Sequence, residues 1–151
     1  MSTQRHLVIA AAGTGGHVMP GLAVAAVMRA RGWRVSWIGT TTGMEASLVE
    51  KHGIDFYALN FQGVRGRGLV GAVKGGVKLL SSGLEARRRL GELKPDAVFS
   101  TGGYVAVPVG YAARTLGIPL VLMNCDADLL LSTQTLMPSL PRVRIYKSEA
   151  K

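Results

Sequence analysis

The residues best suited to chemistry lie in a glycine-rich segment, residues 12–21, with the sequence Ala-Gly-Thr-Gly-Gly-His-Val-Met-Pro-Gly. An apolar run precedes it at residues 6–11, and residues 22–31 carry apolar side chains at helical spacing. The glycines are therefore expected at a strand-to-helix turn, where unpaired N–H groups attract an anion and a ligand can approach the backbone closely. His17 is the only titratable side chain at the mouth of this turn, and an imidazole is suited to act as a general base.

A second glycine turn, Thr101-Gly102-Gly103-Tyr104, follows a predicted strand at residues 96–100. In a parallel sheet both turns lie beyond the carboxyl ends of their strands, where ligands bind. Two turns rich in N–H groups can hold a pyrophosphate between them, with Tyr104 donating a hydrogen bond to a sugar. The alternative is that Tyr104 packs on the neighbouring helix.

A basic, glycine-rich loop at residues 60–68 contains Arg65 and Arg67. Guanidinium groups make bidentate contacts with phosphate, so both arginines are candidates for binding a phosphorylated ligand. The alternative is an ordinary solvated loop.

Strands and helices alternate along the chain, which predicts an α/β fold with a Rossmann-like, doubly wound parallel sheet. Strands are expected at residues 7–11, 33–38, 55–59, 96–100 and 119–123, and helices at residues 20–31, 43–52, 69–93 and from the second glycine turn to residues 116–117. Beyond residue 124 a helix is expected at residues 128–137 and a strand at residues 142–146. One domain, residues 1–146, is predicted, followed by a frayed polar tail at residues 147–151.

The composition indicates a folded, basic protein. Hydrophobic residues make up 48% of the 151 residues, and 18 Lys and Arg against 9 Asp and Glu give a formal net charge of +9. This excess favours an acidic partner, but the few aromatic residues and the lack of a nucleic-acid motif argue against RNA or DNA. A single cysteine, Cys125, and an N-terminus without a signal-peptide core predict a cytoplasmic protein. With no apolar run near the length of a bilayer span, any membrane contact is expected to be peripheral.

The glycine segment and several later motifs together resemble the MurG family of peptidoglycan N-acetylglucosamine (GlcNAc) transferases. The matching residues are Gly13-Thr14-Gly15-Gly16-His17-Val18 with Pro20-Gly21-Leu22-Ala23, then Gly43-Met44-Glu45-Ala46, Gly63-x-Arg65-Gly66-x-Gly68, Lys94-Pro95-Asp96 and Gly102-Gly103-Tyr104-Val105. The resemblance covers residues 6–122 continuously and extends more weakly to about residue 143. It implies the N-terminal half of a two-domain, GT-B glycosyltransferase.

The resemblance implies an inverting hexosyltransferase, without metal or cofactor, that moves GlcNAc from UDP-GlcNAc to lipid I to form lipid II. The N-terminal half would bind the lipid-linked acceptor at the cytoplasmic face of the bacterial inner membrane. His17 would be the catalytic base, and Thr14, Gly15, Gly16, Gly102, Gly103, Tyr104, Arg65, Arg67 and Asp126 would bind substrate. The chain is expected to lack the C-terminal donor-binding domain and to be inactive without it.

The sequence departs from the family pattern after the fifth predicted strand. The family usually has His-Glu-Gln-Asn where this chain has Met123-Asn124-Cys125-Asp126. Asp126 would place an anion where the family's asparagine helps to hold the donor, and an anion repels a nucleotide diphosphate unless a counter-charge is near. Ala12, in place of glycine, and Thr101 are smaller departures.

Other functions remain open on the sequence. The chain can be a fragment, one subunit of a split enzyme, or a diverged protein that binds without catalysis. The basic segment at residues 69–94, with apolar side chains between its charges, is also typical of a peripheral membrane-binding module. A small flavodoxin-like or Rossmann-type nucleotide-binding protein ranks last, because residues 39–42, after the second predicted strand, offer no acid for a ribose.

Overall fold

The computed structural model describes residues 4–13, 15–41, 43–60, 69–103, 105–124 and 144–147. Along the chain these residues form β1 (His6–Ala11), α1 (Gly15–Ala30), β2 (Arg34–Thr40), α2 (Glu45–Lys51), β3 (Asp55–Leu59), α3 (Leu69–Leu93), β4 (Ala97–Gly102), α4 (Ala106–Thr115), β5 (Leu120–Asn124) and β6 (Arg144–Lys147). The predicted loop at residues 60–68, apart from residue 60, and the predicted helix at residues 128–137 lie outside the described residues.

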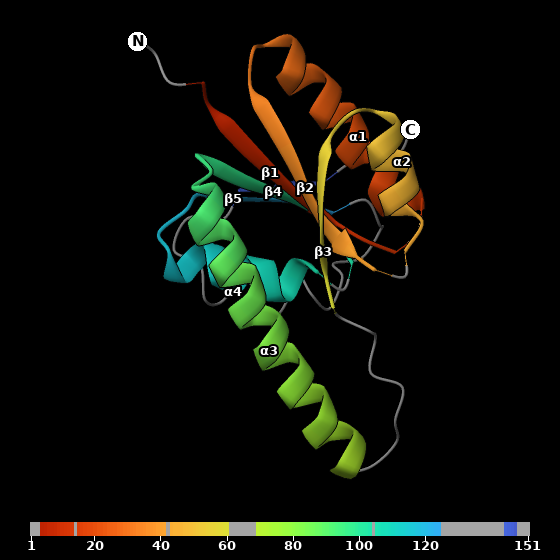
Figure 1. Ribbon diagram of the computed structural model, residues 1–151, viewed down its shortest axis with the longest axis vertical. Coiled ribbons are helices and arrows are strands. Elements are labelled where there is room, and N and C mark those ends of the chain that lie inside the picture. The colour runs from red at the N-terminus through yellow and green to blue at the C-terminus, as the bar shows by residue number, and fades with distance from the viewer. Residues whose placement is uncertain are drawn as a thin grey trace.

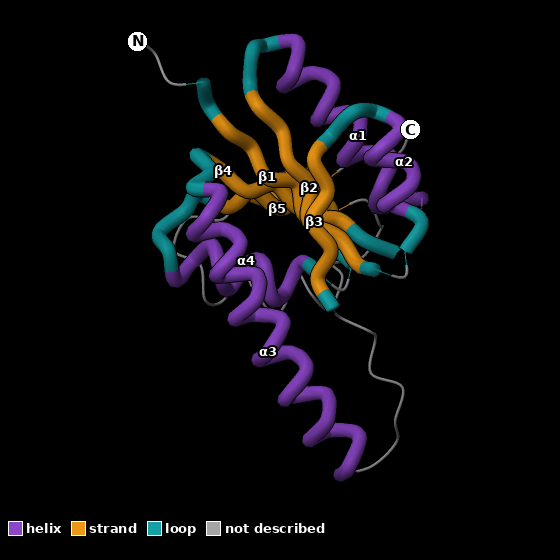
Figure 2. The backbone as a smooth tube through the Cα atoms, in the orientation of Figure 1, coloured by secondary structure: helices purple, strands orange, loops and turns teal. Residues whose placement is uncertain are grey.

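The strands form one six-stranded parallel sheet in the order β3-β2-β1-β4-β5-β6 (Figures 1 and 2). The chain winds outward from β1 in one direction and then from β4 in the other. The predicted Rossmann-like parallel sheet is confirmed. The order reverses between β1 and β4, which is the place in such a sheet where ligands bind beyond the carboxyl ends of the strands.

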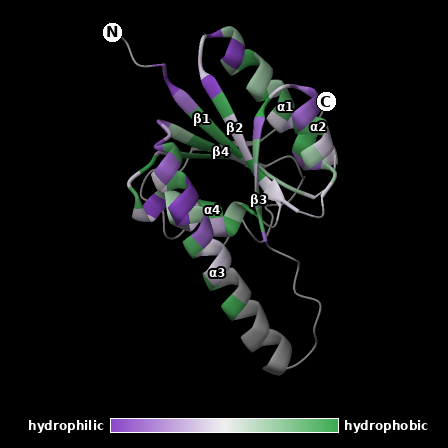
Figure 3. Cartoon of the chain, viewed as in Figure 1, coloured by the Kyte–Doolittle hydropathy of each residue, from purple (hydrophilic) through white to green (hydrophobic). Residues whose placement is uncertain are grey.

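Helices cover both faces of the sheet, with α1 and α2 on one face and α3 and α4 on the other (Figure 1). Alternate residues of each central strand point to opposite faces, so Ile9 and Trp37 pack beneath α1 and α2, while Val8 and Val98 pack beneath α3 and α4. Both faces are apolar, as expected for a buried parallel sheet. The hydrophobic residues of the sheet stand out in the centre of Figure 3.

Helix α1 begins at Gly15 instead of residue 20, so the predicted start of this helix was wrong. The glycine segment itself forms the first turn, and Pro20 lies inside the helix. Since proline has no N–H, it leaves the carbonyl of Gly16 without its usual intrahelical donor. Gly21 is required in the next turn because a Cβ there would lie 2.5 Å from the buried ring of Trp37.

Strand β4 continues through Thr101 and Gly102, which were expected to form a turn. Helix α3 covers Leu69–Leu93 as predicted, although glycines interrupt its sequence. The predicted last strand is found as β6, and it extends to Lys147, the first residue of the expected tail. The boundaries of the sheet strands otherwise follow the apolar runs closely.

Candidate functional site

The two glycine turns meet at the carboxyl edge of the sheet, where β1 and β4 lie side by side. Ala11, the last residue of β1, pairs with Gly102. Gly103 has a φ of 84°, and a Cβ at this position would collide with the carbonyl oxygen of Ala12. Close approach of the two turns therefore depends on Gly103 having no side chain.

His17 lies in the first turn of α1 and is half-buried against the second glycine turn. Its Nδ1 lies 3.1 Å from the carbonyl oxygen of Thr101, and the Thr101 hydroxyl donates a 2.6 Å hydrogen bond to the His17 carbonyl. The predicted catalytic histidine, which belongs to the first glycine turn, thus contacts the second glycine turn. Of the remaining histidines, His6 is buried at the start of β1 and His52 is exposed after α2.

The first turn of α1 presents Gly15 and Gly16 at the site. Backbone N–H groups in the first turn of a helix have no intrahelical acceptor. Gly16 is exposed, and a Cβ built on Gly15 would meet nothing within 4 Å, so a ligand has room to approach this backbone. The helix N-terminus also favours a negative charge at this place.

A buried carboxylate to which the sequence analysis assigned no role supports the first glycine turn. Glu45, at the start of α2, is fully buried. Its Oε1 accepts hydrogen bonds of 2.7 Å from both the N–H and the hydroxyl of Thr40, and its Oε2 lies 3.5 Å from the N–H of Gly13. Gly43 leaves room for this carboxylate, since a Cβ there would overlap it. A glutamate in a helix's first turn was the available sequence signal.

Two N–H groups of the turns are already engaged within the protein. The N–H of Gly13 is directed to Glu45, and the N–H of Gly102 donates to the Ser100 hydroxyl at 3.2 Å. Any anion between the turns would therefore depend on other donors, including those of Gly15, Gly16 and Gly103.

Several predicted site residues lie outside the described residues: Thr14, Arg65, Arg67, Tyr104 and Asp126. Asn124, which precedes Cys125 and Asp126, is the last residue of β5. Among the residues that the structure describes, no group of three or more His, Cys, Asp and Glu side chains is placed to hold a metal ion.

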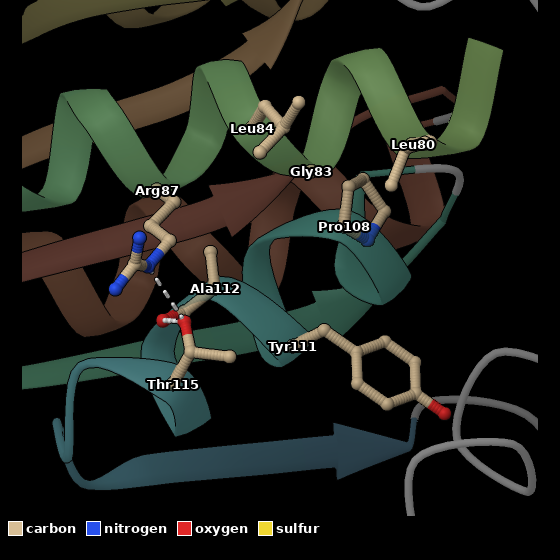
Figure 4. A pocket seen from close by; sticks show the side chains of 8 residues that line it. All are labelled: Leu80, Gly83, Leu84, Arg87, Pro108, Tyr111, Ala112 and Thr115. Atoms are coloured by element: carbon tan, nitrogen blue, oxygen red, sulfur yellow. Dashed lines mark hydrogen bonds between the residues drawn. The ribbon is translucent and has the colours of Figure 1, made fainter. Parts of the chain in front are cut away.

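A groove of about 500 Å³ lies between α3 and α4, on the face of the sheet opposite α1. Its lining is mostly apolar and includes Leu80, Leu84, Pro108 and Tyr111. Figure 4 shows Arg87 at one end, where its Nε donates a 3.2 Å hydrogen bond to the Thr115 hydroxyl. None of the described helices has the length and hydrophobicity required to cross a bilayer.

Comparisons with known proteins agree with this geometry. The chain is 50% identical over 139 residues to the UDP-N-acetylglucosamine–N-acetylmuramyl-(pentapeptide) pyrophosphoryl-undecaprenol N-acetylglucosamine transferase of Janthinobacterium sp. (strain Marseille), covering 92% of this chain and 39% of that protein. The enzyme of the same name from Chromobacterium violaceum is 48% identical over 134 residues, which cover 89% and 37% of the two chains. The chain therefore spans about two fifths of the length of these relatives.

The crystal structure of Acinetobacter baumannii MurG superposes with a TM-score of 0.81 at 41% identity, covering 93% of this chain and 41% of that chain. Residues 7–144 match the family described as glycosyltransferase family 28 N-terminal domain. The resemblance inferred from the motifs and the topology of the sheet are both accounted for by this match. The chain belongs to the glycosyltransferase family 28 N-terminal domain family.

Proposed function

We propose that this chain is the acceptor-binding half of a MurG-like enzyme, which transfers GlcNAc from UDP-GlcNAc to lipid I and forms lipid II in peptidoglycan synthesis. The observation that carries the proposal is the pairing of His17 with the second glycine turn at the point where the strand order reverses. The names of relatives that are 48–50% identical support the choice of reaction.

In the proposed reaction the His17 imidazole removes the proton from an acceptor hydroxyl. The hydroxyl oxygen then attacks the anomeric carbon of GlcNAc, and UDP leaves from the opposite face with the bonding electrons, which inverts the anomeric configuration. A positioned general base typically accelerates such a step about 10²- to 10⁴-fold. No metal or cofactor is assigned a role here.

The lipid-linked pyrophosphate is assigned to the space between the glycine turns, with Gly15 and Gly16 donating from the start of α1 and Gly103 from the second turn. The helix N-terminus adds a favourable electrostatic contribution. We further assign Thr14 and Tyr104 to the acceptor sugar and Arg65 and Arg67 to phosphate. We assign Asp126 to the donor side of the site, and the remaining donor contacts to a C-terminal domain or a separate subunit.

The enzyme is proposed to work as a peripheral protein at the cytoplasmic face of the bacterial inner membrane. A formal net charge of +9 attracts an anionic surface. Val77, Leu80 and Leu84 on α3 are exposed apolar side chains that an interface can bury. The same features support the other candidate, a membrane-binding module that makes no use of the glycine turns.

Calorimetry separates the two candidates. The purified chain is titrated with a water-soluble lipid I analogue, and separately with UDP-GlcNAc. We expect the analogue to bind and UDP-GlcNAc alone to bind far more weakly. His17→Ala is expected to weaken the analogue by no more than about 2- to 10-fold, since it removes at most one hydrogen bond to the ground-state ligand.

The opposite pattern would favour the membrane module. No heat of binding with the lipid I analogue, together with vesicle binding that survives both His17→Ala and Gly16→Ala, would remove the basis for an acceptor site. Turnover of lipid I and UDP-GlcNAc by the chain alone would contradict the assignment of the donor contacts to a second domain or subunit.

A further inference from the structure

Strand β4 contains an irregularity directly beside His17. Ala10 pairs with Ser100, but the next residue of β1, Ala11, pairs with Gly102, so Thr101 is an extra residue in the parallel ladder. Such bulges are rare in parallel pairs, and they redirect the side chain of the residue that they insert. The bulge explains how a residue inside a strand comes to face the first turn of α1.

The Ser100 hydroxyl holds this bulge together. It donates a 2.8 Å hydrogen bond to the carbonyl oxygen of Ala10 and accepts one of 3.2 Å from the N–H of Gly102. Ser100 is buried, with 1% of its surface exposed. A side-chain hydroxyl therefore engages backbone groups on both sides of the place where the regular ladder is broken.

Because of the bulge, Thr101 contacts His17 with two different groups. Its hydroxyl donates to the His17 carbonyl at 2.6 Å, and its own carbonyl oxygen lies 3.1 Å from His17 Nδ1. Thr101 is fully buried, so water does not compete at its hydroxyl. The first contact fixes the backbone of His17, and the second fixes the orientation of its ring.

A carbonyl oxygen can only accept a hydrogen bond, so the contact requires the proton of the neutral imidazole to be on Nδ1. The lone pair is then on Nε2, on the other side of the ring. We propose that Thr101 is a positioning residue that selects this tautomer of His17, so that Nε2 is the atom that receives the acceptor's proton. This proposal rests on the proposed function, in which His17 is the base.

The same contact suits the charged state that follows proton transfer. The acceptor O–H bond breaks, an Nε2–H bond forms, and the Nδ1–H group of the resulting imidazolium still donates to the Thr101 carbonyl. A hydrogen bond from a charged donor is stronger than one from a neutral donor. Thr101 therefore favours the base in the state that it reaches during the reaction.

The test reads the tautomer directly and needs no substrate. Long-range ¹H–¹⁵N correlation NMR on the labelled chain, at about pH 8.5 where an ordinary imidazole is neutral, identifies which nitrogen of His17 carries the proton. We expect Nδ1–H in the unmodified chain. Thr101→Val keeps the shape and the backbone carbonyl but loses the hydroxyl bond that holds the His17 backbone beside this carbonyl. We therefore expect the Nδ1 contact to loosen and the tautomer ratio to shift towards Nε2–H by about 2- to 10-fold, the range for one hydrogen bond.

Two further variants serve as controls. Thr101→Ser restores the hydroxyl and is expected to restore the Nδ1–H tautomer. Thr115→Val removes a hydroxyl on α4 that hydrogen-bonds Ala112 and Arg87, far along the chain from His17, and should leave the His17 tautomer unchanged.

Finding Nε2–H in the unmodified chain would overturn the proposal, as would an unchanged tautomer in a folded Thr101→Val. If Thr101→Val does not fold, the proposal is tested with the unmodified chain and with Ser100→Ala. Loss of the Ser100 hydroxyl, which holds the bulge, is expected to shift the tautomer ratio in the same direction. The result is independent of acceptor binding. An Nδ1–H tautomer without calorimetric binding of the lipid I analogue would reject the proposed function while leaving the geometry intact.

Discussion

At Gly103 two separate constraints act on one residue. Its backbone has a φ of 84°, and a Cβ would collide with the Ala12 carbonyl. An L-residue with a side chain pays about 1–2 kcal/mol for the left-handed region, and forcing extra atoms into a packed site adds about 1–3 kcal/mol. We predict that Gly103→Ala lowers the free energy of unfolding by about 2–5 kcal/mol, the sum of these ranges, measured by urea denaturation.

Gly117 provides a matched control for this prediction. It has a φ of 68°, but a Cβ there would meet nothing within 4 Å. Gly117→Ala should therefore lose only the conformational part, about 1–2 kcal/mol. Equal losses in the two variants would mean that the contact between the glycine turns does not constrain Gly103.

The individual contacts at the candidate site could not be predicted from the sequence. The sequence singled out His17 because it lies beside glycines. Its contact with Thr101 depends on a β-bulge that no local sequence pattern predicts. Glu45 belongs to a recognised motif, yet its burial beneath the first glycine turn depends on how α2 packs against β2. The contacts of Glu45 with Gly13 and of His17 with Thr101 join residues distant in sequence, and their geometry is set by the whole fold.

At the scale of the elements, apolar spacing was a reliable guide. The predicted ranges of β3 and α3 agree with the structure at both ends. The start of α1 was misplaced because glycines and a proline usually mark a boundary, whereas here they form the helix's first turns. Gly21 lets this helix approach the sheet closely, because a Cβ there would lie 2.5 Å from the Trp37 ring.

Helix α3 also presents an apolar stripe away from the core. Val77, Leu80 and Leu84 are 63%, 67% and 61% exposed, and their spacing places them on one side of the helix. We predict that Leu80→Gln with Leu84→Gln weakens partitioning onto anionic vesicles by about 10- to 30-fold, if each leucine loses about 1 kcal/mol from half-burial in the interface. Vesicle sedimentation measures this directly.

The control for the stripe is on the other face of the sheet. Met19 and Val27 on α1 are 59% and 53% exposed, so Met19→Gln with Val27→Gln removes comparable apolar surface. We expect this variant to bind vesicles like the unmodified chain. Equal loss in both double variants would show that membrane binding is not localised to α3.

At the scale of the whole molecule, the glycine turns lie at the carboxyl ends of the parallel strands, and the buried His6 lies at the amino end of β1. The alternation of strands and helices was sufficient to predict that both glycine turns lie at the carboxyl ends of the strands, because parallel strands are joined by crossovers that return the chain to the same end of the sheet. The strand order and the burial of His6 were not predicted. The candidate site could thus be located from sequence, although its detailed contacts could not. A change at His6 therefore lies at the opposite end of β1 from the candidate site.

His6, at the end of β1 opposite the candidate site, contacts α3, β2 and the residue that precedes β4. Its Nδ1 lies 3.2 Å from the Leu93 carbonyl at the end of α3, its Nε2 lies 2.7 Å from the Ser36 hydroxyl on β2, and its backbone N–H donates to Asp96. Burial lowers the pKa of His6 below its ordinary value, and the Leu93 hydrogen bond opposes this shift only in part. The folded protein therefore favours the neutral ring.

This lowered pKa predicts a pH-dependent stability. Between the folded pKa and the ordinary value of about 6.5 the unfolded chain binds more protons at His6 than the folded chain does, so stability rises with pH. The contribution is fully present above about pH 6.5 and is lost as the pH falls through the folded pKa. Urea denaturation from about pH 5 to pH 8 should show this rise in the unmodified chain and a smaller rise in His6→Gln. His52→Gln, at an exposed position, is the control and should keep the full rise; if His6→Gln keeps it too, the buried histidine is not its source.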